Sequence, residues 1–268
     1  MAGFETRFER LEFKYLIDEP KVEDIRRYLT AYCEPDPHNP SETGIFKRPS
    51  QRGYSIHSLY LDSPGLAFHR AKERGDPDRL KLRVRTYSET SPAVLELKRK
   101  YSEVTEKKRV VVERKCVDDA VRGFGMPIDS NPQGQEFLDE FSLIAAKFGA
   151  IPMLNIRYER EAYRSLVDEY ARVTFDRKIG AQCAFDWDLL GDSENWIEFD
   201  HYWGENVPPL PVVLEIKCHA LVPWWITELV RSHCLYRRSF SKYSIGTYLN
   251  ARFYGDHEVA SRSARVMA

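Results

Sequence analysis

Basic side chains recur at every second position in several short stretches of this sequence, and carboxylates occupy a few of the matching positions. Lys81, Arg83 and Arg85 form one such row, and Glu215 with Lys217 repeats the pattern far along the chain. A spacing of two places side chains on one face of a β-strand. Arginine binds phosphate oxygens through a planar fork of N–H donors, while carboxylates bind the hard divalent cations that bridge phosphates. The pattern therefore favours binding of a phosphate-rich anion together with a metal ion.

The charged residues that we expect to point to one side of their strands are mostly cationic. The cations are Arg10, Lys14, Arg83, Arg85, Lys98, Lys107, Arg109, Arg160, Arg172, Lys217 and Lys242, and the carboxylates are Glu12, Glu96, Asp176 and Glu215. Eleven cations against four carboxylates make an excess of charge that is costly to enclose unless an anion binds there. Two simpler interpretations stay open: each row is a solvated strand face, or the Glu-x-Lys steps are ordinary cross-strand pairs.

The elements that must position these residues follow from hydrophobic periodicity. Strands are expected near residues 8–17, 54–62, 80–87, 94–99, 106–113, 153–164, 170–176 and 212–217, and longer helices near 21–32, 133–147, 223–235 and 245–253. The hairpin-scale spacing of the strands favours antiparallel pairing. The helices carry apolar stripes, so the apolar strand faces can pack beneath them while the charged faces turn inward. We predict an α+β fold, an antiparallel eight-stranded β-barrel tunnel with a charged interior and helices packed outside.

The domain organisation follows from the same pattern. We expect a single domain over residues 1–268, with its core at about 8–250 and a frayed tail at 254–268. Residues 33–53 are rich in proline and should form a long loop. Its Lys47, Arg48 and Arg52 could close over an anion, although a plain solvated loop is the simpler interpretation.

Composition limits the possible functions. The formal net charge is -1, from 40 Lys and Arg against 41 Asp and Glu, so nonspecific binding to nucleic acid is not expected. The five cysteines form no CxxC pair, which is typical of thiols in a reducing cytoplasm. We expect neither a secretory signal nor a transmembrane segment, and a cytoplasmic location.

Motifs for other chemistries are absent from the sequence. It contains no GxxxxGK[ST] or GxGxxG nucleotide loop, no HExxH zinc motif and no GxSxG nucleophile elbow. His57 and His219 lie on predicted strands, where packing or pairing is the expected role.

The charged rows also occur as an ordered set of short motifs. They are Arg10-x-Glu12-x-Lys14-Tyr15, Ser58-Leu59-Tyr60-x-Asp62, Arg83-x-Arg85-x-Tyr87, Glu96-x-Lys98, Lys107-x-Arg109, Tyr158-x-Arg160, Arg172-Val173-x-x-Asp176, Glu215-x-Lys217 and Ser241-Lys242-Tyr243. In type and order this set resembles the VTC domain, the polyphosphate polymerase branch of the triphosphate tunnel metalloenzymes. The resemblance spans about residues 8–250.

The resemblance implies a role for each motif residue. It implies that the γ-phosphate of ATP is transferred to a polyphosphate chain, with Mn²⁺ or Mg²⁺ as cofactor. Phosphates would be bound by Lys14, Arg83, Arg85, Lys98, Lys107, Arg109, Arg160, Arg172, Lys217 and Lys242, with hydrogen bonds from Tyr158 and Ser241. Seven of these would take part in catalysis: Lys14, Arg83, Arg85, Lys98, Arg160, Arg172 and Lys242. Glu215 would hold the metal, with help from Glu96 or Glu12.

Two other functions stay open for the same residues. One is hydrolysis of inorganic triphosphate or a nucleoside triphosphate, and the other is binding of polyphosphate without catalysis. Relatives also carry a regulatory domain and a membrane anchor that we do not expect in this chain, which leaves open any membrane-associated partner protein.

Overall fold

The computed structural model describes residues 10–37, 39, 53–102, 104–128, 131–168, 170–199 and 212–250. The predictions for Lys47, Arg48 and Arg52 and for a frayed tail at 254–268 lie outside these residues. The chain divides into two compact units. The first unit comprises Met1–Tyr54, Glu159–Lys178 and Asp200–Phe240, and the second comprises Ser55–Tyr158, Ile179–Phe199 and Ser241–Ala268.

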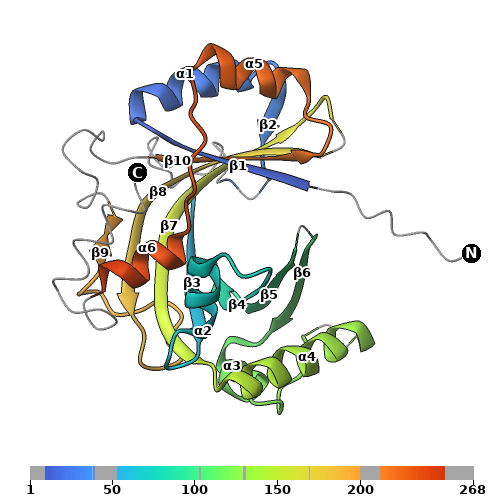
Figure 1. The fold of residues 1–268 in the computed structure, drawn as a ribbon, viewed down its shortest axis with the longest axis vertical. Coiled ribbons are helices and arrows are strands. Elements are labelled where there is room, and N and C mark those ends of the chain that lie inside the picture. The colour runs from blue at the N-terminus through green and yellow to red at the C-terminus, as the bar shows by residue number, and fades with distance from the viewer. Residues whose placement is uncertain are drawn as a thin grey trace, which may run out of the picture. The chain divides into compact units, whose positions relative to one another are not determined.

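Strands and helices alternate along the chain (Figure 1). The strands are β1 (Arg10–Ile17), β2 (Cys33–Pro35), β3 (Tyr54–Asp62), β4 (Asp78–Thr86), β5 (Ala93–Tyr101), β6 (Val104–Val112), β7 (Ile151–Ser165), β8 (Ala171–Cys183), β9 (Ile197–Glu198) and β10 (Val212–His219). The helices are α1 (Glu19–Leu29), α2 (Ala67–Arg74), α3 (Val117–Val121), α4 (Pro132–Phe148), α5 (Trp224–Ser232) and α6 (Lys242–Leu249). None of these helices combines the length and the apolar composition needed to cross a bilayer.

The strands pair in the order β1-β10-β8-β7-β3-β4-β5-β6, with β2 added beside β7 and β9 beside β8. The α+β class and the antiparallel pairing are as predicted. The eight-stranded barrel is not found, because no pairing among the described residues joins β6 to β1 and the sheet is open. Alternation specifies the face of each side chain but not whether the first and last strands meet. The charged run 106–109 on β6 suits an edge strand, because charged side chains disfavour further strand pairing.

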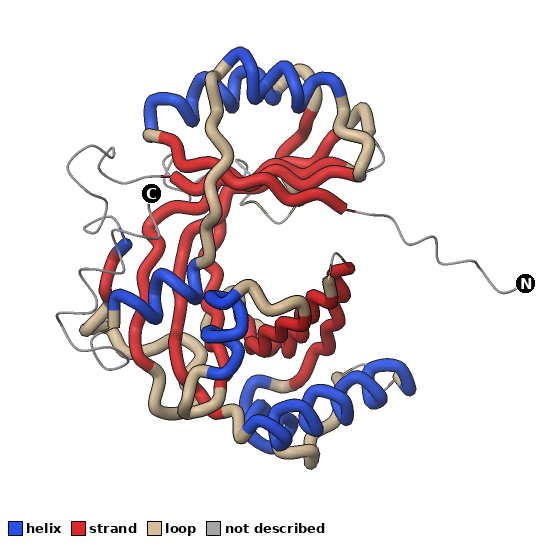
Figure 2. The backbone as a smooth tube through the Cα atoms, viewed as in Figure 1, coloured by secondary structure: helices blue, strands red, loops and turns tan. Residues whose placement is uncertain are grey.

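In the first unit, β1, β10 and β8 share one charged and one apolar face. Lys14, Glu215 and Thr174 are direct cross-strand partners, so their side chains lie on the same face. The other face is apolar, and there Phe175 packs into a buried cluster with residues of α1 and α5, including Trp225. The two helices lie side by side over these strands (Figures 1 and 2). The helices thus cover the apolar face and not the charged one.

The second unit repeats this division of faces on β3, β4, β5 and β6. Tyr60, Arg83, Glu96 and Arg109 follow one another across the four strands in direct register. The apolar residues on the opposite face are buried against α3 and α4, where Phe141 is fully enclosed. The prediction that apolar strand faces pack beneath helices is therefore confirmed in each unit.

Several elements differ from the sequence prediction, including α6, β8 and β2. Helix α6 begins at Lys242 instead of Ile245, because Ser241 is its N-cap and accepts a hydrogen bond from Ser244 N (3.4 Å). Strand β8 continues to Cys183, beyond the expected end at 176. Cys33–Pro35, which we expected in a loop, forms β2 because it pairs with the end of β7.

Candidate functional site

A buried carboxylate organises the charged face of the second unit. Glu96 on β5 accepts a hydrogen bond from Arg83 Nε on β4 (2.5 Å). It also forms an ion pair with Lys107 on β6, whose Nζ lies 2.6 Å from the carboxylate. Arg85 Nη2 lies 3.6 Å from the same carboxylate, whose side chain is only 4% exposed. We call these four residues the Glu96 cluster. One acid holds three cations in place, and the cluster keeps a net positive charge.

The surroundings of Glu96 keep it ionised. Burial alone would raise the pKa of its carboxyl group, but the charges of Arg83, Arg85 and Lys107 outweigh burial and hold the pKa well below its ordinary value. The cluster is therefore charged at any physiological pH. Its cations are positioned before a ligand arrives, which lowers the cost of ordering them.

Aromatic residues connect the Glu96 cluster to α6. Tyr60 OH accepts a hydrogen bond from Arg83 Nη1 (3.2 Å), and its ring stacks on Tyr243 at 4.8 Å. Tyr243 OH donates to the buried Asp62 (2.8 Å). Next to it, Lys242 Nζ lies 4.4 Å from the centre of the Tyr158 ring. The first turn of α6 is thus attached to the sheet that carries the cluster, which places Lys242 and Ser241.

A buried donor and a buried hydroxyl on this face have no partner among the described residues. They are Arg85 Nε and Ser58 Oγ, and the two residues are direct cross-strand partners on β4 and β3. A buried polar group left without a hydrogen bond costs about 1–3 kcal/mol. Both groups therefore carry an uncompensated desolvation cost among the described residues.

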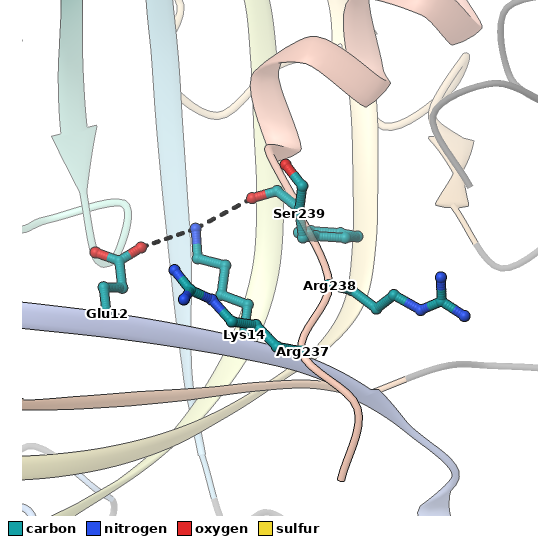
Figure 3. A pocket seen from close by; sticks show the side chains of 6 residues that line it. Glu12, Lys14, Arg237, Arg238 and Ser239 are labelled. Atoms are coloured by element: carbon teal, nitrogen blue, oxygen red, sulfur yellow. Dashed lines mark hydrogen bonds and ion pairs between the residues drawn. The ribbon is translucent and has the colours of Figure 1, made fainter. Parts of the chain in front are cut away.

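The charged face of the first unit places lysines between carboxylates. Lys14 Nζ on β1 lies 2.8 Å from Glu12 and donates to Phe240 O (3.1 Å), as Figure 3 shows. On β10, Lys217 Nζ lies 2.5 Å from Glu215. Two carboxylates and two lysines therefore share neighbouring positions of β1 and β10.

The same face continues onto β8 and β7. Arg160 donates two parallel hydrogen bonds to Asp176, from Nε at 2.7 Å and from Nη2 at 2.8 Å. Asp176 is completely buried, so this pair holds the guanidinium in one orientation. Arg172 is exposed on β8, and the buried Thr174 Oγ1 has no partner among the described residues.

The carboxylates of the first unit fit a divalent cation better than Glu96 does. Glu12 and Glu215 lie on adjacent strands of one face and form ion pairs with Lys14 and Lys217. Mg²⁺ is usually held by one or two carboxylates together with substrate phosphates, and not by a complete protein cage. In keeping with that, no group of three or more His, Cys, Asp or Glu suited to a metal occurs in the described part of the chain. Glu96 pairs with three cations in the structure, and its predicted part in metal binding stays a prediction.

The structure brings the predicted site residues into two sets, one in each unit. Those of the second unit are Arg83, Arg85, Glu96, Lys98, Lys107, Arg109, Tyr158, Ser241 and Lys242, and those of the first are Glu12, Lys14, Arg160, Arg172, Glu215 and Lys217. The prediction of one cavity shared by them all stays a prediction.

Four residues of these faces were missing from the predicted site. Ser58 and Thr174 carry no charge, so the alternating pattern of charged residues does not identify them. Arg237 and Arg238 lie outside any period-two stretch, and only the structure brings them beside Lys14 (Figure 3).

Comparison with known proteins gives a family and a set of distant structural likenesses. A family model, VTC domain, matches residues 9–250. No curated protein matches the chain. A candidate adenylate cyclase from Bacillus halodurans is 10% identical, with coverage of 87% of this chain and 95% of that one and a TM-score of 0.46. The candidate adenylyl cyclase HpAC1 from Hippeastrum, reported to have a dominant triphosphatase activity, is 14% identical, with coverage of 88% and 94% and a TM-score of 0.44. The PH1819 protein from Pyrococcus horikoshii is 13% identical, with coverage of 90% and 99% and a TM-score of 0.41.

Proposed function

This chain belongs to the VTC domain family, and from that membership and its two cation-rich sheet faces we propose that it is a metal-dependent polyphosphate polymerase. It transfers the γ-phosphate of ATP to the end of a polyphosphate chain. The observation that carries the proposal is the Glu96 cluster, where one buried acid holds three cations on the face opposite α3 and α4. If these residues only formed ion pairs with one another, equal numbers of cations and carboxylates would be expected. This face instead has more cations than carboxylates, which favours binding of a polyanion.

The cations of both units bind and orient phosphates in this proposal. Arg83 and Arg160 are each fixed by a buried carboxylate, so their N–H groups keep one orientation. Exposed Arg172, Lys98 and Lys107 remain open to solvent, where an incoming phosphate can reach them. Phosphoryl transfer depends chiefly on positioning and on neutralising charge, and an array of fixed cations supplies both.

Glu12 and Glu215 are the residues that would hold a divalent cation. When bound, Mn²⁺ or Mg²⁺ would neutralise charge on the phosphate oxygens that it bridges. Lys14 and Lys217 lie beside these carboxylates and would instead pair with phosphate oxygens once the carboxylates hold the metal.

The reaction requires no strong base from the protein. A terminal oxygen of the polyphosphate chain, already ionised, attacks the γ-phosphorus of ATP and forms the new P–O bond. The bond from that phosphorus to the β,γ-bridging oxygen breaks, and ADP leaves with the electron pair. This agrees with the chemistry of both charged faces, in which most of the groups near the proposed phosphates are arginines and lysines.

The direct test is incubation of the purified, folded protein with ATP and Mn²⁺. We expect polyphosphate that lengthens with time, together with one ADP for each phosphate added. Release of inorganic phosphate without chain growth would show a triphosphate hydrolase instead. Polyphosphate binding with no turnover of ATP would show a binding module.

A matched pair of variants separates catalysis from binding. Glu215→Gln removes a charge at the proposed metal position, and we expect it to lose turnover while polyphosphate affinity is kept or increased. Glu228→Gln removes the same charge from an exposed position on α5 in the same unit and should leave both unchanged. Equal turnover by the two variants would exclude Glu215 from the metal site.

A further inference from the structure

A groove in the first unit contains cations that the proposed transfer reaction does not use. It has a volume of about 410 Å³, and Figure 3 shows five of its side chains labelled. The lining residues are Glu12, Lys14, Arg237, Arg238, Ser239 and Phe240. Lys14 belongs to the charged face of β1, so the groove continues directly from a proposed phosphate-binding position.

The backbone fixes the two arginines beside β1. Arg237 forms an antiparallel bridge with Tyr15, and Arg238 N donates to Lys14 O at 2.8 Å. The Arg237 guanidinium also lies 5.2 Å from the centre of the Phe13 ring. The segment therefore extends the edge of β1 as a short additional strand. This placement follows from main-chain hydrogen bonds and does not depend on the arginine side chains.

The charge of the groove indicates the class of ligand. Three lining residues are cationic and one is a carboxylate, and that carboxylate, Glu12, already pairs with Lys14. Both arginines are exposed to solvent, so a ligand can reach their N–H groups without displacing the fold. Phe240 is only 5% exposed and offers no open ring face to stack a nucleobase. The lining thus suits a chain of phosphates better than the base of a nucleotide.

We propose that this groove binds successive phosphates of a polyphosphate chain beyond those held at Lys14, and that Arg237 and Arg238 thereby favour long chains over triphosphate. The inference rests on the proposed function and deepens it, because it assigns the growing polymer to a particular surface. A triphosphate has only three phosphate groups to share among Lys14 and the other cations of the face, whereas a longer chain has further phosphates for both arginines. A longer chain gains a charge-assisted contact from each.

The test compares long polyphosphate, of about 100 phosphates, with triphosphate as ligands of the wild-type protein and two double variants. R237A/R238A removes both guanidinium groups. R27A/R231A removes the same charge from exposed positions on α1 and α5, the helices that cover the opposite, apolar face of the sheet. R237A/R238A loses the charge-assisted hydrogen bonds of two guanidinium groups, so we expect it to weaken binding of the long chain at least about tenfold. Triphosphate affinity should change by less than about twofold, and the control variant should bind both ligands as the wild type does.

Three results would overturn the inference: an equal loss for both ligands, no loss for either, or the same loss in R27A/R231A. If R237A/R238A unfolds, R237K/R238K can replace it in the test, because it keeps both positive charges while removing the planar guanidinium groups. This variant should lose part of the preference for the long chain. If the wild-type protein binds neither ligand, the proposed function itself fails. If the wild-type protein binds both ligands and the arginine variants bind them equally well, only the role proposed for the groove is refuted.

Discussion

At the scale of single residues, the carboxylates of the charged faces have different ion-pair partners. Glu96 and Asp176 pair with arginines, whereas Glu12 and Glu215 pair with lysines. The difference lies in the type of cation, because arginine presents a planar, rigid guanidinium while lysine is a point charge on a flexible stem. We therefore expect the carboxylates paired with lysine to exchange that partner for a metal ion more readily.

Glu96→Gln should destabilise the protein because it leaves three cations close together without their counterion. Loss of one partner from a buried ion pair costs about 3 kcal/mol or more. Urea unfolding should therefore show a lower free energy of unfolding by about that amount. The matched change Glu106→Gln lies on β6 with an exposed carboxylate 3.4 Å from Lys108, and it should cost less than about 1 kcal/mol. Similar losses in the two variants would show that Glu96 is not the centre of the cluster.

The pH dependence of stability should report the same carboxylate. The folded protein holds the pKa of Glu96 below its ordinary value, so the stability it contributes is present above the unfolded-state pKa, about 4.3. That contribution is lost as pH falls from there toward the folded-state pKa. Measured between pH 7 and pH 3, the difference in unfolding free energy between the wild type and Glu96→Gln should therefore begin to narrow below about pH 4. A constant difference over that range would contradict the ionisation assigned to Glu96.

Arg83→Ala and Arg172→Ala should have different effects on stability. Each removes a proposed phosphate contact of about 1.5–3 kcal/mol, so each should weaken triphosphate binding by at least about tenfold. Arg172 is exposed, and its loss should leave unfolding within about 0.5 kcal/mol of the wild type. Arg83 is also bonded to Glu96 and Tyr60, so its removal should lower stability as well. Isothermal titration calorimetry measures the triphosphate affinity, and urea unfolding measures the stability. Unchanged affinity in Arg172→Ala would show that Arg172 is not part of the site.

At the scale of elements, the first unit has a second network of charges on the face of its strands that lies away from the proposed phosphates. In the first unit Glu161 on β7 lies on the side of α1, where Arg26 Nε donates to it at 2.8 Å and Arg177 Nη1 at 3.0 Å. Tyr163 OH donates to the same carboxylate at 2.5 Å. Burial would raise the pKa of Glu161, yet the bonds from Arg26 and Tyr163 lower it. This network attaches α1 to the sheet on the face away from the proposed phosphates.

Glu161→Ala should therefore destabilise the first unit without changing phosphate binding. The variant leaves two arginines and a tyrosine without their shared acceptor, at a cost of about 3 kcal/mol or more. Hydrogen exchange should show faster exchange in α1 (Glu19–Leu29), while triphosphate affinity of the folded fraction stays at the wild-type value. A loss of affinity in a protein that remains folded would place Glu161 in the site.

At the scale of the whole molecule, a chain with a net charge of -1 presents local faces that are strongly cationic. Basic residues outnumber carboxylates on the charged strand faces, and acidic residues elsewhere in the chain offset them. Attraction of a polyanion should therefore act at short range and be sensitive to salt, because exposed charges are screened over about 8–10 Å at 0.1–0.15 M ionic strength.

Metal removal should separate binding from turnover. Cations of the protein supply most of the proposed phosphate contacts, whereas the carboxylates Glu12 and Glu215 supply the proposed metal contacts. Chelation by EDTA should abolish ATP-dependent chain growth but leave polyphosphate bound, as equilibrium dialysis can measure, and added Mn²⁺ should restore growth. Release of polyphosphate on chelation would show that the metal, and not the basic faces, holds the polymer.

The sequence by itself determined which side chains share a face. Alternation with period two is a local property of the chain, so it predicted Lys14, Arg83, Glu96 and Glu215 on charged strand faces and the apolar faces beneath helices. The ordered motifs also identified the family, which the match over residues 9–250 confirms.

Only the tertiary structure decided which charges meet and whether the sheet closes. The contact of three cations with Glu96 depends on the register of β4, β5 and β6, which the alternation of side chains does not determine. Lys14 and Phe240 bond across 226 residues of sequence, and that contact brings Arg237 and Arg238 into the groove. Side-chain direction is set within a few residues, whereas pairing between distant strands is set by how the whole chain packs. For that reason the faces could be predicted, while the partners, the open sheet and the groove could not.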